Sequence, residues 1–375
     1  MERFGKEEIQ AVERVIRSGN LSPFFSNFKG GEQVQAFEKE FADYLGRRYA
    51  VSVCNGTVAL ELALQAMGIR RGDEVITTAL SFIATGTAIL RVDAKPVFVD
   101  IEPKTLNINP EEVKTAITRK TKAIIPVSLN GYPCQMDELI EVADDIMILE
   151  DAAQALGAEF DGQKIGTFGE GATFSFQQSK TLSTGGEGGM FVTDDPDLYE
   201  RALNIRNHGN IYGTMTDVCC TNLRLSEMQS AFGREQLLKL DRFNRVQTEN
   251  AEYFMQKLKP PPFHGLYSYP LPEDVKPSYY LMPVVDNICH GYDRAKFLAW
   301  AAKKHISCGR PGQNIGFYRK LIYESPIFSG AKKHPCPVAE WAKDHILLFD
   351  IHRWKSFNAF KKEVFQILLY LKSKA

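Results

Sequence analysis

Three kinds of group that could do chemistry follow short apolar segments in the first half of the chain. Lys180 comes shortly after the segment Ala172–Phe176, and the carboxyl groups of Glu150 and Asp151 end another. The turn Asn55-Gly56-Thr57 follows a third segment and opens a helical pattern. A lysine amine can bind an aldehyde, a buried carboxylate can hold a cationic nitrogen, and the first N–H groups of a helix can bind a phosphate.

Each of these features also has an ordinary explanation. Lys180 can be a solvated surface charge, and Glu150 and Asp151 can flank a loop. The turn can be a plain strand–helix connection with Thr57 as its N-cap. The combination is more specific, because pyridoxal 5′-phosphate carries a phosphate, a basic ring nitrogen and an aldehyde. In this interpretation Asp151 keeps the ring nitrogen protonated, and Lys180 binds the aldehyde and later transfers protons.

The elements that would position these groups alternate between strands and helices. Helical patterns cover Val58–Met67 and the segment after Asn109-Pro110, where an N-cap residue precedes a proline at the first helical position. Such alternation is typical of an α/β domain with a largely parallel sheet, whose carboxyl strand ends carry the site. The predicted strands are Val51–Cys54, Glu74–Leu80, Pro96–Ile101, Ala123–Val127, Ile146–Glu150, Ala172–Phe176 and Met190–Thr193.

A long helical pattern, Ser226–Leu258, follows the predicted sheet and ends at a run of three prolines. The remainder mixes short strand and helix patterns and is interpreted as a smaller α+β domain. We expect a large domain over residues 1–240 and a small C-terminal domain over residues 241–375. The clearest patterns in the small domain are a strand at Tyr279–Val285 and helices at Arg294–Lys304 and Ser356–Leu371.

Composition excludes several classes of function. The chain has 375 residues, 45 basic and 46 acidic side chains and a formal net charge of −1, which argues against a general nucleic-acid binder. Apolar runs are shorter than the roughly 20 residues of a membrane span, and the N-terminal residues are charged where a signal peptide would be apolar. The seven cysteines and seven histidines lack metal-ligand spacing. We therefore expect a cytoplasmic protein with reduced thiols, no metal and no membrane contact.

The chemistry-bearing segments resemble the DegT-type sugar aminotransferases, pyridoxal-phosphate enzymes of fold type I in the aspartate aminotransferase superfamily. The resemblance starts near Val12, is strong from Gly46 to Leu240 and weakens beyond. Seven segments carry it in order: Cys54–Leu60, Gly72–Ile76, Pro96–Ile101, Glu150–Gln154, Phe174–Lys180, Gly186–Gly189 and Asn222–Ser226.

This resemblance implies a three-layer α/β/α fold with a mostly parallel sheet, and it assigns roles residue by residue. Lys180 matches the Schiff-base lysine, and Asp151 matches the acid paired with the ring nitrogen. Asn222 matches an asparagine that reaches the phosphate from the neighbouring subunit, which implies a homodimer with shared active sites. The other matched cofactor contacts are Gln154 at the ring hydroxyl, Phe82 stacked on the ring, and Gly56, Thr57 and Ser175 at the phosphate.

Two departures from the family pattern affect the expected substrate site. The family usually has Gly-Tyr-Asn-Tyr-Arg where this chain has Cys220–Arg224, so the asparagine and arginine remain and both aromatic residues are lost. The N-terminal segment before the first helix is also short, since the helical pattern begins at Glu7. The residues expected at the substrate are His208, Arg224 and Arg310, the last lying in a poorly matched segment.

The function implied by the resemblance is transfer of an amino group from glutamate or glutamine to a keto-sugar, nucleotide-linked or free, or to a keto-cyclitol. Two alternatives stay open. One is a dehydratase or an aromatising synthase with the same cofactor, although Lys180 argues against the dehydratases that carry histidine at that position. The other is a non-catalytic regulatory protein on the same fold, against which the joint presence of Asp151, Gln154 and Lys180 counts.

Overall fold

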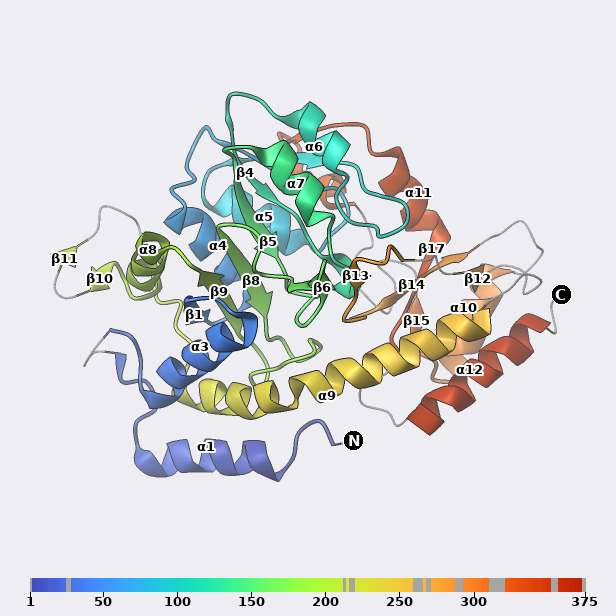
Figure 1. The fold of residues 1–375 in the computed structure, drawn as a ribbon, viewed down its shortest axis with the longest axis horizontal. Helices are drawn as coiled ribbons and strands as arrows, with labels where there is room; N and C mark the ends of the chain where they lie inside the picture. Colours follow the sequence, from blue (N-terminus) through green and yellow to red (C-terminus); the bar gives the residue numbers. More distant parts are fainter. Residues whose placement is uncertain are drawn as a thin grey trace.

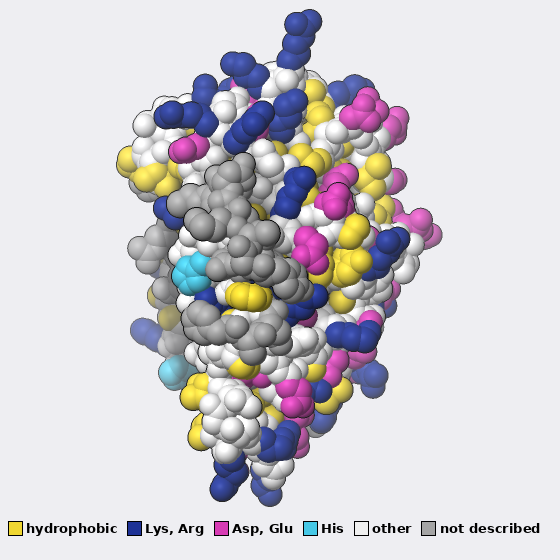
Figure 2. All heavy atoms as spheres, turned by 90° about the vertical axis from the view of Figure 1, so that its left-hand side faces the viewer, with side chains coloured by type: hydrophobic (Ala, Val, Ile, Leu, Met, Phe, Trp, Pro, Cys, Tyr) yellow, Lys and Arg dark blue, Asp and Glu magenta, His cyan; other side chains and the backbone are white. Residues whose placement is uncertain are grey.

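The structure is a computed structural model of the chain. It describes residues 2–24, 28–211, 214–215, 220–258, 266–267, 271–286, 293–309, 321–351 and 357–372. Within these ranges, no helix combines the length and the apolar character that crossing a membrane requires. The face shown in Figure 2 carries both basic and acidic side chains.

An eight-stranded sheet forms the centre of the molecule, in the order β1-β9-β8-β5-β4-β2-β3-β16 (Figure 1). β9 runs antiparallel to β1 and β8, and the other neighbouring strands are parallel. The predicted mostly parallel sheet is therefore confirmed, and all seven predicted strands are present with ends shifted by at most two residues. The strands are β1 (Tyr49–Val53), β2 (Glu74–Thr78), β3 (Lys95–Val99), β4 (Thr121–Ile125), β5 (Met147–Asp151), β8 (Gly171–Ser175), β9 (Gly189–Thr193) and β16 (Lys332–Lys333).

Helices cover both faces of this sheet because successive strand residues point to opposite sides. Ile124 of β4 belongs to one apolar cluster, together with Phe41 of one helix and Leu139 of another, whereas Ile125 belongs to a second. The first face is covered by α3 (Glu32–Leu45), α6 (Pro110–Ala116), α7 (Met136–Ala143) and the first part of α9 (Glu227–Leu258). The second face is covered by α4 (Gly56–Ala66), α5 (Ile83–Arg91) and α8 (Pro196–Arg206).

A smaller sheet in the order β12-β14-β17-β15 forms the C-terminal part of the structure with α10 and α12. α9 links the two parts, since Leu240 packs in the core of the large sheet and Phe254 in the core of the small one. Residue 240, the expected boundary, thus lies inside a continuous helix, and the division at that residue stays a prediction. The elements are β12 (Leu266–Tyr267), β14 (Met282–Asp286), α10 (Arg294–Lys303), β15 (Cys308–Gly309), β17 (Ile346–Phe349) and α12 (Phe357–Lys372).

The remaining helices, strands and turns pack around these two sheets. α1 (Lys6–Ser18) packs along α9, as Figure 1 shows below the sheet. β13 (Val275–Lys276) pairs with β6, so a segment after residue 240 also completes a sheet of the first part. The other elements are β6 (Glu159–Phe160), β7 (Gln163–Lys164), β10 (Asn210–Ile211), β11 (Thr214–Met215), α11 (Pro337–His345) and the 3₁₀ turns Leu129–Gly131, Ile322–Glu324 and Pro326–Phe328.

Candidate active site

A cavity of about 560 Å³ lies at the edge of the large sheet where β5 and β8 end. β1 runs in the same direction as these two strands, so the helix that follows it also begins at this edge. Parallel α/β sheets bind ligands outside the carboxyl ends of their strands. Seven of the predicted residues line the cavity: Gly56, Thr57, Phe82, Asp151, Gln154, Ser175 and Lys180.

Asp151 is the last residue of β5, and its carboxyl group points into the cavity although it is only 5% exposed. Thr85 Oγ1 donates to Oδ2 over 2.9 Å, and the backbone N–H of Ala153 donates to Oδ1 over 3.2 Å. Burial raises the pKa of Asp151, while these two donors and the charge of Lys180 oppose the rise. A cationic N–H partner in the cavity would favour the carboxylate form.

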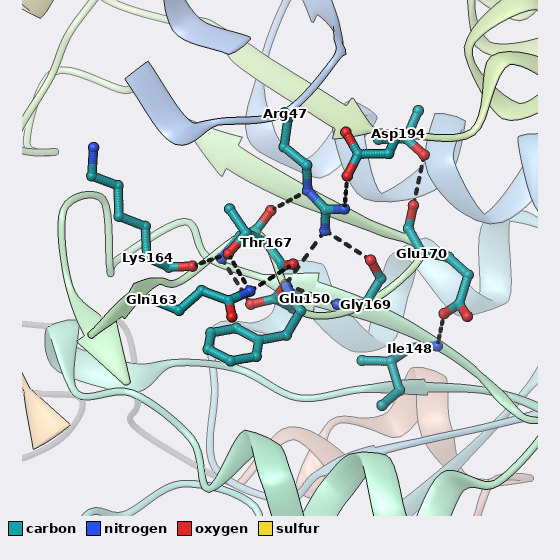
Figure 3. Close-up of polar contacts among 12 residues, drawn as sticks. Arg47, Ile148, Glu150, Gln163, Lys164, Thr167, Gly169, Glu170 and Asp194 are labelled. Atoms are coloured by element: carbon teal, nitrogen blue, oxygen red, sulfur yellow. Dashed lines mark hydrogen bonds and ion pairs between the residues drawn. The ribbon is translucent and has the colours of Figure 1, made fainter. Parts of the chain in front are cut away.

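Glu150, the preceding residue, points to the other side of β5 and holds a neighbouring turn (Figure 3). Its carboxylate accepts hydrogen bonds from the backbone N–H groups of Gly166, Phe168 and Gly169 over 2.8, 2.7 and 3.2 Å. Burial raises the pKa of Glu150, and the three donors and Arg47, 4.0 Å away, oppose the rise. Both carboxyl groups therefore lie within the strand rather than in a flanking loop, and only Asp151 lines the cavity.

The N-terminus of α4 forms the opposite wall. Asn55 is the N-cap, and its side chain accepts a hydrogen bond from Val58 N over 2.9 Å, so Thr57 is not the cap. The backbone N–H groups of Gly56 and Thr57 open the helix, where N–H groups lack intrahelical acceptors and favour an anion. A Cβ at Gly56 would lie 2.7 Å from Ser175 Cβ, so glycine allows the helix to begin against the end of β8.

Lys180 extends into the cavity from the polar turn that follows β8. Its backbone N–H donates to Gln177 O over 2.8 Å, and Arg3 Nη2 donates to its carbonyl oxygen over 2.6 Å. The side chain is half-buried, and its Nζ lies 4.7 Å from the centroid of the Tyr280 ring. Within the described part of the chain, no carboxylate forms an ion pair with this amine.

Phe82 and Gln154 complete the lining around Asp151. Phe82 is the N-cap residue of α5 and is 37% exposed, although sequence alone would have assigned it to the core. Gln154 is 8% exposed, and its Oε1 accepts a hydrogen bond from the backbone N–H of Asn130 over 2.9 Å. An aromatic face exposed to a cavity beside a buried amide is suited to a flat polar ring.

Of the other predicted residues, those that the structure describes do not line this cavity. Asn222 is exposed and its Oδ1 accepts from Arg224 N over 3.2 Å. His208 is exposed in a left-handed backbone conformation with φ of 63°, and the guanidinium of Arg224 lies 5.2 Å from the centroid of the Phe24 ring. Arg310 lies outside the described residues.

Among the cavity residues without a predicted role, Ser81, Thr85 and Tyr280 contact Asp151, directly or through Thr85, or face Lys180. Thr85 and Ser81 form a hydroxyl chain to Asp151, since their Oγ atoms lie 3.0 Å apart and Thr85 donates to the carboxylate. Their spacing of four residues at a helix start is a signal that sequence could have supplied. Tyr280 comes from the C-terminal part and has no such signal, because only tertiary structure brings it to Lys180.

The described residues fit pyridoxal 5′-phosphate. The open N–H groups of α4 suit a phosphate, the buried Asp151 suits a protonated ring nitrogen, and the Lys180 amine suits an aldehyde. The exposed face of Phe82 would be covered by the ring. Each feature of the cofactor thus has a complementary group on the wall of one cavity.

Comparison with known proteins agrees with this fit. The L-glutamine:2-deoxy-scyllo-inosose aminotransferase of Streptomyces kanamyceticus is 42% identical over 259 residues, 65% of this chain and 60% of that protein. The GDP-perosamine synthase of Escherichia coli O157:H7 is 40% identical over 232 residues, 61% of this chain and 64% of that protein.

Solved structures match nearly the whole chain. An aminotransferase from Psychrobacter cryohalolentis has a TM-score of 0.90 and 30% identity, covering 99% of this chain and 98% of that one. The E. coli GDP-4-keto-6-deoxy-D-mannose-3-dehydratase with bound hydrated pyridoxal phosphate has a TM-score of 0.85 and 29% identity, covering 98% of both chains.

The family match extends over residues 2–359 and so includes the cavity, both of its walls and most of the C-terminal part. The chain therefore belongs to the DegT/DnrJ/EryC1/StrS aminotransferase family of pyridoxal-phosphate-dependent, fold type I proteins.

Proposed function

We propose that the protein transfers an amino group from glutamate or glutamine to a keto-sugar, nucleotide-linked or free, or to a keto-cyclitol. The observation that carries the proposal is the convergence of Lys180, Asp151 and the N-terminus of α4 on one cavity. The names of the two curated relatives, a glutamine:deoxy-scyllo-inosose aminotransferase and a GDP-perosamine synthase, support an amino donor and a sugar or cyclitol acceptor.

Pyridoxal 5′-phosphate, when bound, supplies an aldehyde that combines with amines and a protonated ring that withdraws electrons. Asp151 holds the proton on the ring nitrogen, since a carboxylate beside a cation stabilises the protonated form. Gly56 and Thr57 bind the phosphate through their backbone N–H groups, with the hydroxyl of Ser175 as a side-chain donor. Phe82 covers one ring face, and the Gln154 amide lies beside the ring hydroxyl.

Lys180 has two tasks in this proposal. Its amine would bind the aldehyde, and the amino donor would then displace the lysine. The freed amine would take the proton from the α-carbon of the donor and return it to the cofactor, and water would release the rest of the donor as a keto acid. The same steps in reverse, with the keto acceptor, move the amino group to the sugar or cyclitol.

We propose that the working unit is a homodimer in which Asn222 reaches the phosphate in the partner's site. Asn222 is exposed and lies outside the cavity lining of its own chain, which leaves its side chain accessible to a second copy. In such a dimer, residues from both chains would surround each cofactor.

The half-reaction with the amino donor tests this function. Purified protein loaded with pyridoxal 5′-phosphate should lose its visible absorbance when glutamate or glutamine is added, and a keto-sugar or keto-cyclitol should restore it. Lys180→Ala should abolish both changes, whereas Lys39→Ala, which alters an exposed lysine paired with Asp43, should leave both unchanged. Turnover by Lys180→Ala at the wild-type rate would overturn the proposal.

The requirement for the donor separates this function from an elimination. An aminotransferase consumes one amino donor for each acceptor, so the amino product should appear in equal amount with the keto acid of the donor, 2-oxoglutarate from glutamate or 2-oxoglutaramate from glutamine. Conversion of a keto substrate without donor consumption would instead assign a dehydratase or aromatising reaction. A chain that takes up no cofactor under any of these conditions would favour a regulatory role.

A further inference from the structure

The aromatic ring that faces Lys180 comes from a distant segment of the chain. Lys180 Nζ lies 4.7 Å from the centroid of the Tyr280 ring, within the roughly 6 Å at which a ring face attracts an ammonium group. Tyr280 is 7% exposed and lines the same cavity as Lys180. Partial removal from water strengthens such an attraction.

The phenol group fixes this ring to the turn that carries the lysine. Tyr280 Oη and Ser179 Oγ lie 3.0 Å apart. The backbone N–H and the hydroxyl of Ser179 both donate to Gln177 Oε1, over 2.6 and 2.7 Å. Since the backbone N–H of Lys180 also donates to Gln177 O, the ring and the lysine are held by one hydrogen-bonded turn.

The backbone around Tyr280 is anchored to the turn at Asn130 and Gly131. Ser278 N donates to Gly131 O over 2.9 Å, and Leu281 N donates to Asn130 O over 3.2 Å. The backbone N–H of Asn130 in turn donates to Gln154, another cavity residue. The ring therefore has a fixed position relative to both Lys180 and the residues beside Asp151.

From these contacts we propose that Tyr280 is a positioning residue for Lys180, whose ring face holds the protonated amine inside the cavity. This rests on the proposed function, in which the Lys180 amine takes the proton from the donor's α-carbon while the electron pair of that C–H bond passes to the cofactor. The ring face stabilises the ammonium group that the transfer forms and keeps it in place to return the proton. The proton and the electron pair stay within the site, so no further reactant is needed.

Two substitutions separate the ring from the hydroxyl. Tyr280→Leu removes the aromatic face, and Tyr280→Phe keeps the face but removes the bond to Ser179. Tyr323→Leu is the matched control, because Lys333 Nζ lies 4.9 Å from the Tyr323 ring outside the cavity. If Tyr280→Leu lowers the melting temperature of the cofactor-free protein, Tyr280→Met replaces it as the variant without a ring.

The first readout needs no cofactor. The cofactor-free protein is treated with a limiting amount of an amine-reactive reagent, and labelling of each lysine is followed by peptide mass spectrometry. Loss of the ring face should speed labelling of Lys180 about fivefold in Tyr280→Leu, while Tyr280→Phe stays within about twofold of wild type. Tyr323→Leu should leave the labelling of Lys180 unchanged. Equal labelling of Lys180 in wild type and Tyr280→Leu would overturn the proposal.

The second readout is the half-reaction with glutamate. At saturating donor, Tyr280→Leu should slow loss of the visible band about tenfold and enlarge the isotope effect of α-deuterated glutamate, with little change in KM. Equal slowing in Tyr280→Phe and Tyr280→Leu would assign the effect to the hydroxyl and overturn the role of the ring. Absence of any half-reaction in the wild type would overturn the proposed function instead, and the labelling comparison would still decide the role of Tyr280.

Discussion

At the residue scale, two adjacent carboxyl groups do different work because a strand presents successive side chains to opposite faces. Glu150 accepts three backbone N–H groups and lies beside Arg47, so its local environment compensates its charge. Burial raises the pKa of both carboxyl groups, but Asp151 has only two donors and lines the cavity, where a ligand can reach it. A ligand that brings a cation to Asp151 supplies what the fold leaves out.

Replacement of Asp151 by asparagine should therefore raise the stability of the cofactor-free protein and lower its activity. Below the pKa of an unfolded aspartate, both proteins are neutral at this position and should be equally stable. As pH rises above that value, the unfolded wild type loses its proton before the folded protein does, so the wild type loses stability relative to Asp151→Asn. At neutral pH the cofactor-free variant should melt higher, by about 2 °C, while its transaminase activity falls at least about 100-fold.

Melting curves of the cofactor-free proteins between pH 4 and pH 8, read by calorimetry, check this expectation. If the difference in melting temperature between Asp151→Asn and the wild type became smaller as pH rises, the raised pKa of Asp151 would be contradicted. Full activity of Asp151→Asn would contradict its place at the ring nitrogen.

The sequence was informative at this scale only where a local pattern carried the signal. Asp151 and Lys180 each follow an apolar strand, so their types and positions stood out. Thr85 lies four residues after Ser81 at a helix start, a spacing that sequence could have supplied, whereas Tyr280 lies in a segment far along the chain and reaches the site through tertiary packing. Sequence patterns do not encode which distant segments meet, which is why the contact between Tyr280 and Lys180 could not be predicted.

At the element scale, the site depends on the close approach of α4 to β8. Asn55 caps the helix, and Gly56 packs where a side chain would meet Ser175. β9 also passes close by, since a Cβ at Gly189 would lie 2.5 Å from the Asn55 carbonyl. The absence of side chains at these two glycines lets three elements meet at one point.

Gly56→Ala should disturb this junction. The added methyl would lie 2.7 Å from Ser175 Cβ, so the N-terminus of α4 must move away from β8. We expect the affinity for pyridoxal 5′-phosphate to fall at least about tenfold, which corresponds to roughly 1.4 kcal/mol. Equilibrium titration of the visible band measures it.

Gly330→Ala is the matched control, because no atom lies within 4 Å of the added Cβ. This variant should bind the cofactor as the wild type does. Unchanged affinity in Gly56→Ala would show that the phosphate is bound elsewhere.

Most elements could be predicted because their periodicity is local, and the exceptions have local causes as well. The strand expected over Tyr279–Val285 begins only at Met282. Tyr279 adopts a left-handed conformation with φ of 51°, which interrupts the extended chain and lets residues 278–281 dock on the turn at Asn130. This break in the strand is what places Tyr280 in the cavity.

At the scale of the whole molecule, α9 joins the two cores, and the cavity takes residues from both parts of the chain. The fold class and the mostly parallel sheet could be predicted from the alternating pattern of strands and helices, whereas the order of the strands could not, because alternation does not encode which strands pair. The boundary expected at residue 240 stays a prediction, because α9, which serves both cores, runs through that residue without a break. Whether two chains share each active site is decided by how the chains assemble, and the fold of one chain does not determine it.

Mixing two inactive variants tests the shared site. If Asn222 acts in the partner's site, a dimer of one Lys180→Ala chain and one Asn222→Ala chain has one site with both substitutions and one intact site. Random exchange of subunits should then restore about a quarter of the wild-type activity. If Asn222 acts within its own chain, both sites of the mixed dimer are defective and activity stays at the level of the separate variants.

Trapping the bond between the cofactor and its lysine tests most directly whether Lys180 binds pyridoxal 5′-phosphate. Purified protein is incubated with pyridoxal 5′-phosphate, reduced with borohydride so that the bond to lysine becomes permanent, digested and mapped by mass spectrometry. We expect the modified peptide to carry the cofactor on Lys180, and Lys180→Ala to give no such peptide. Modification confined to another lysine, or no modification of a protein that is folded and saturated with the cofactor, would contradict it.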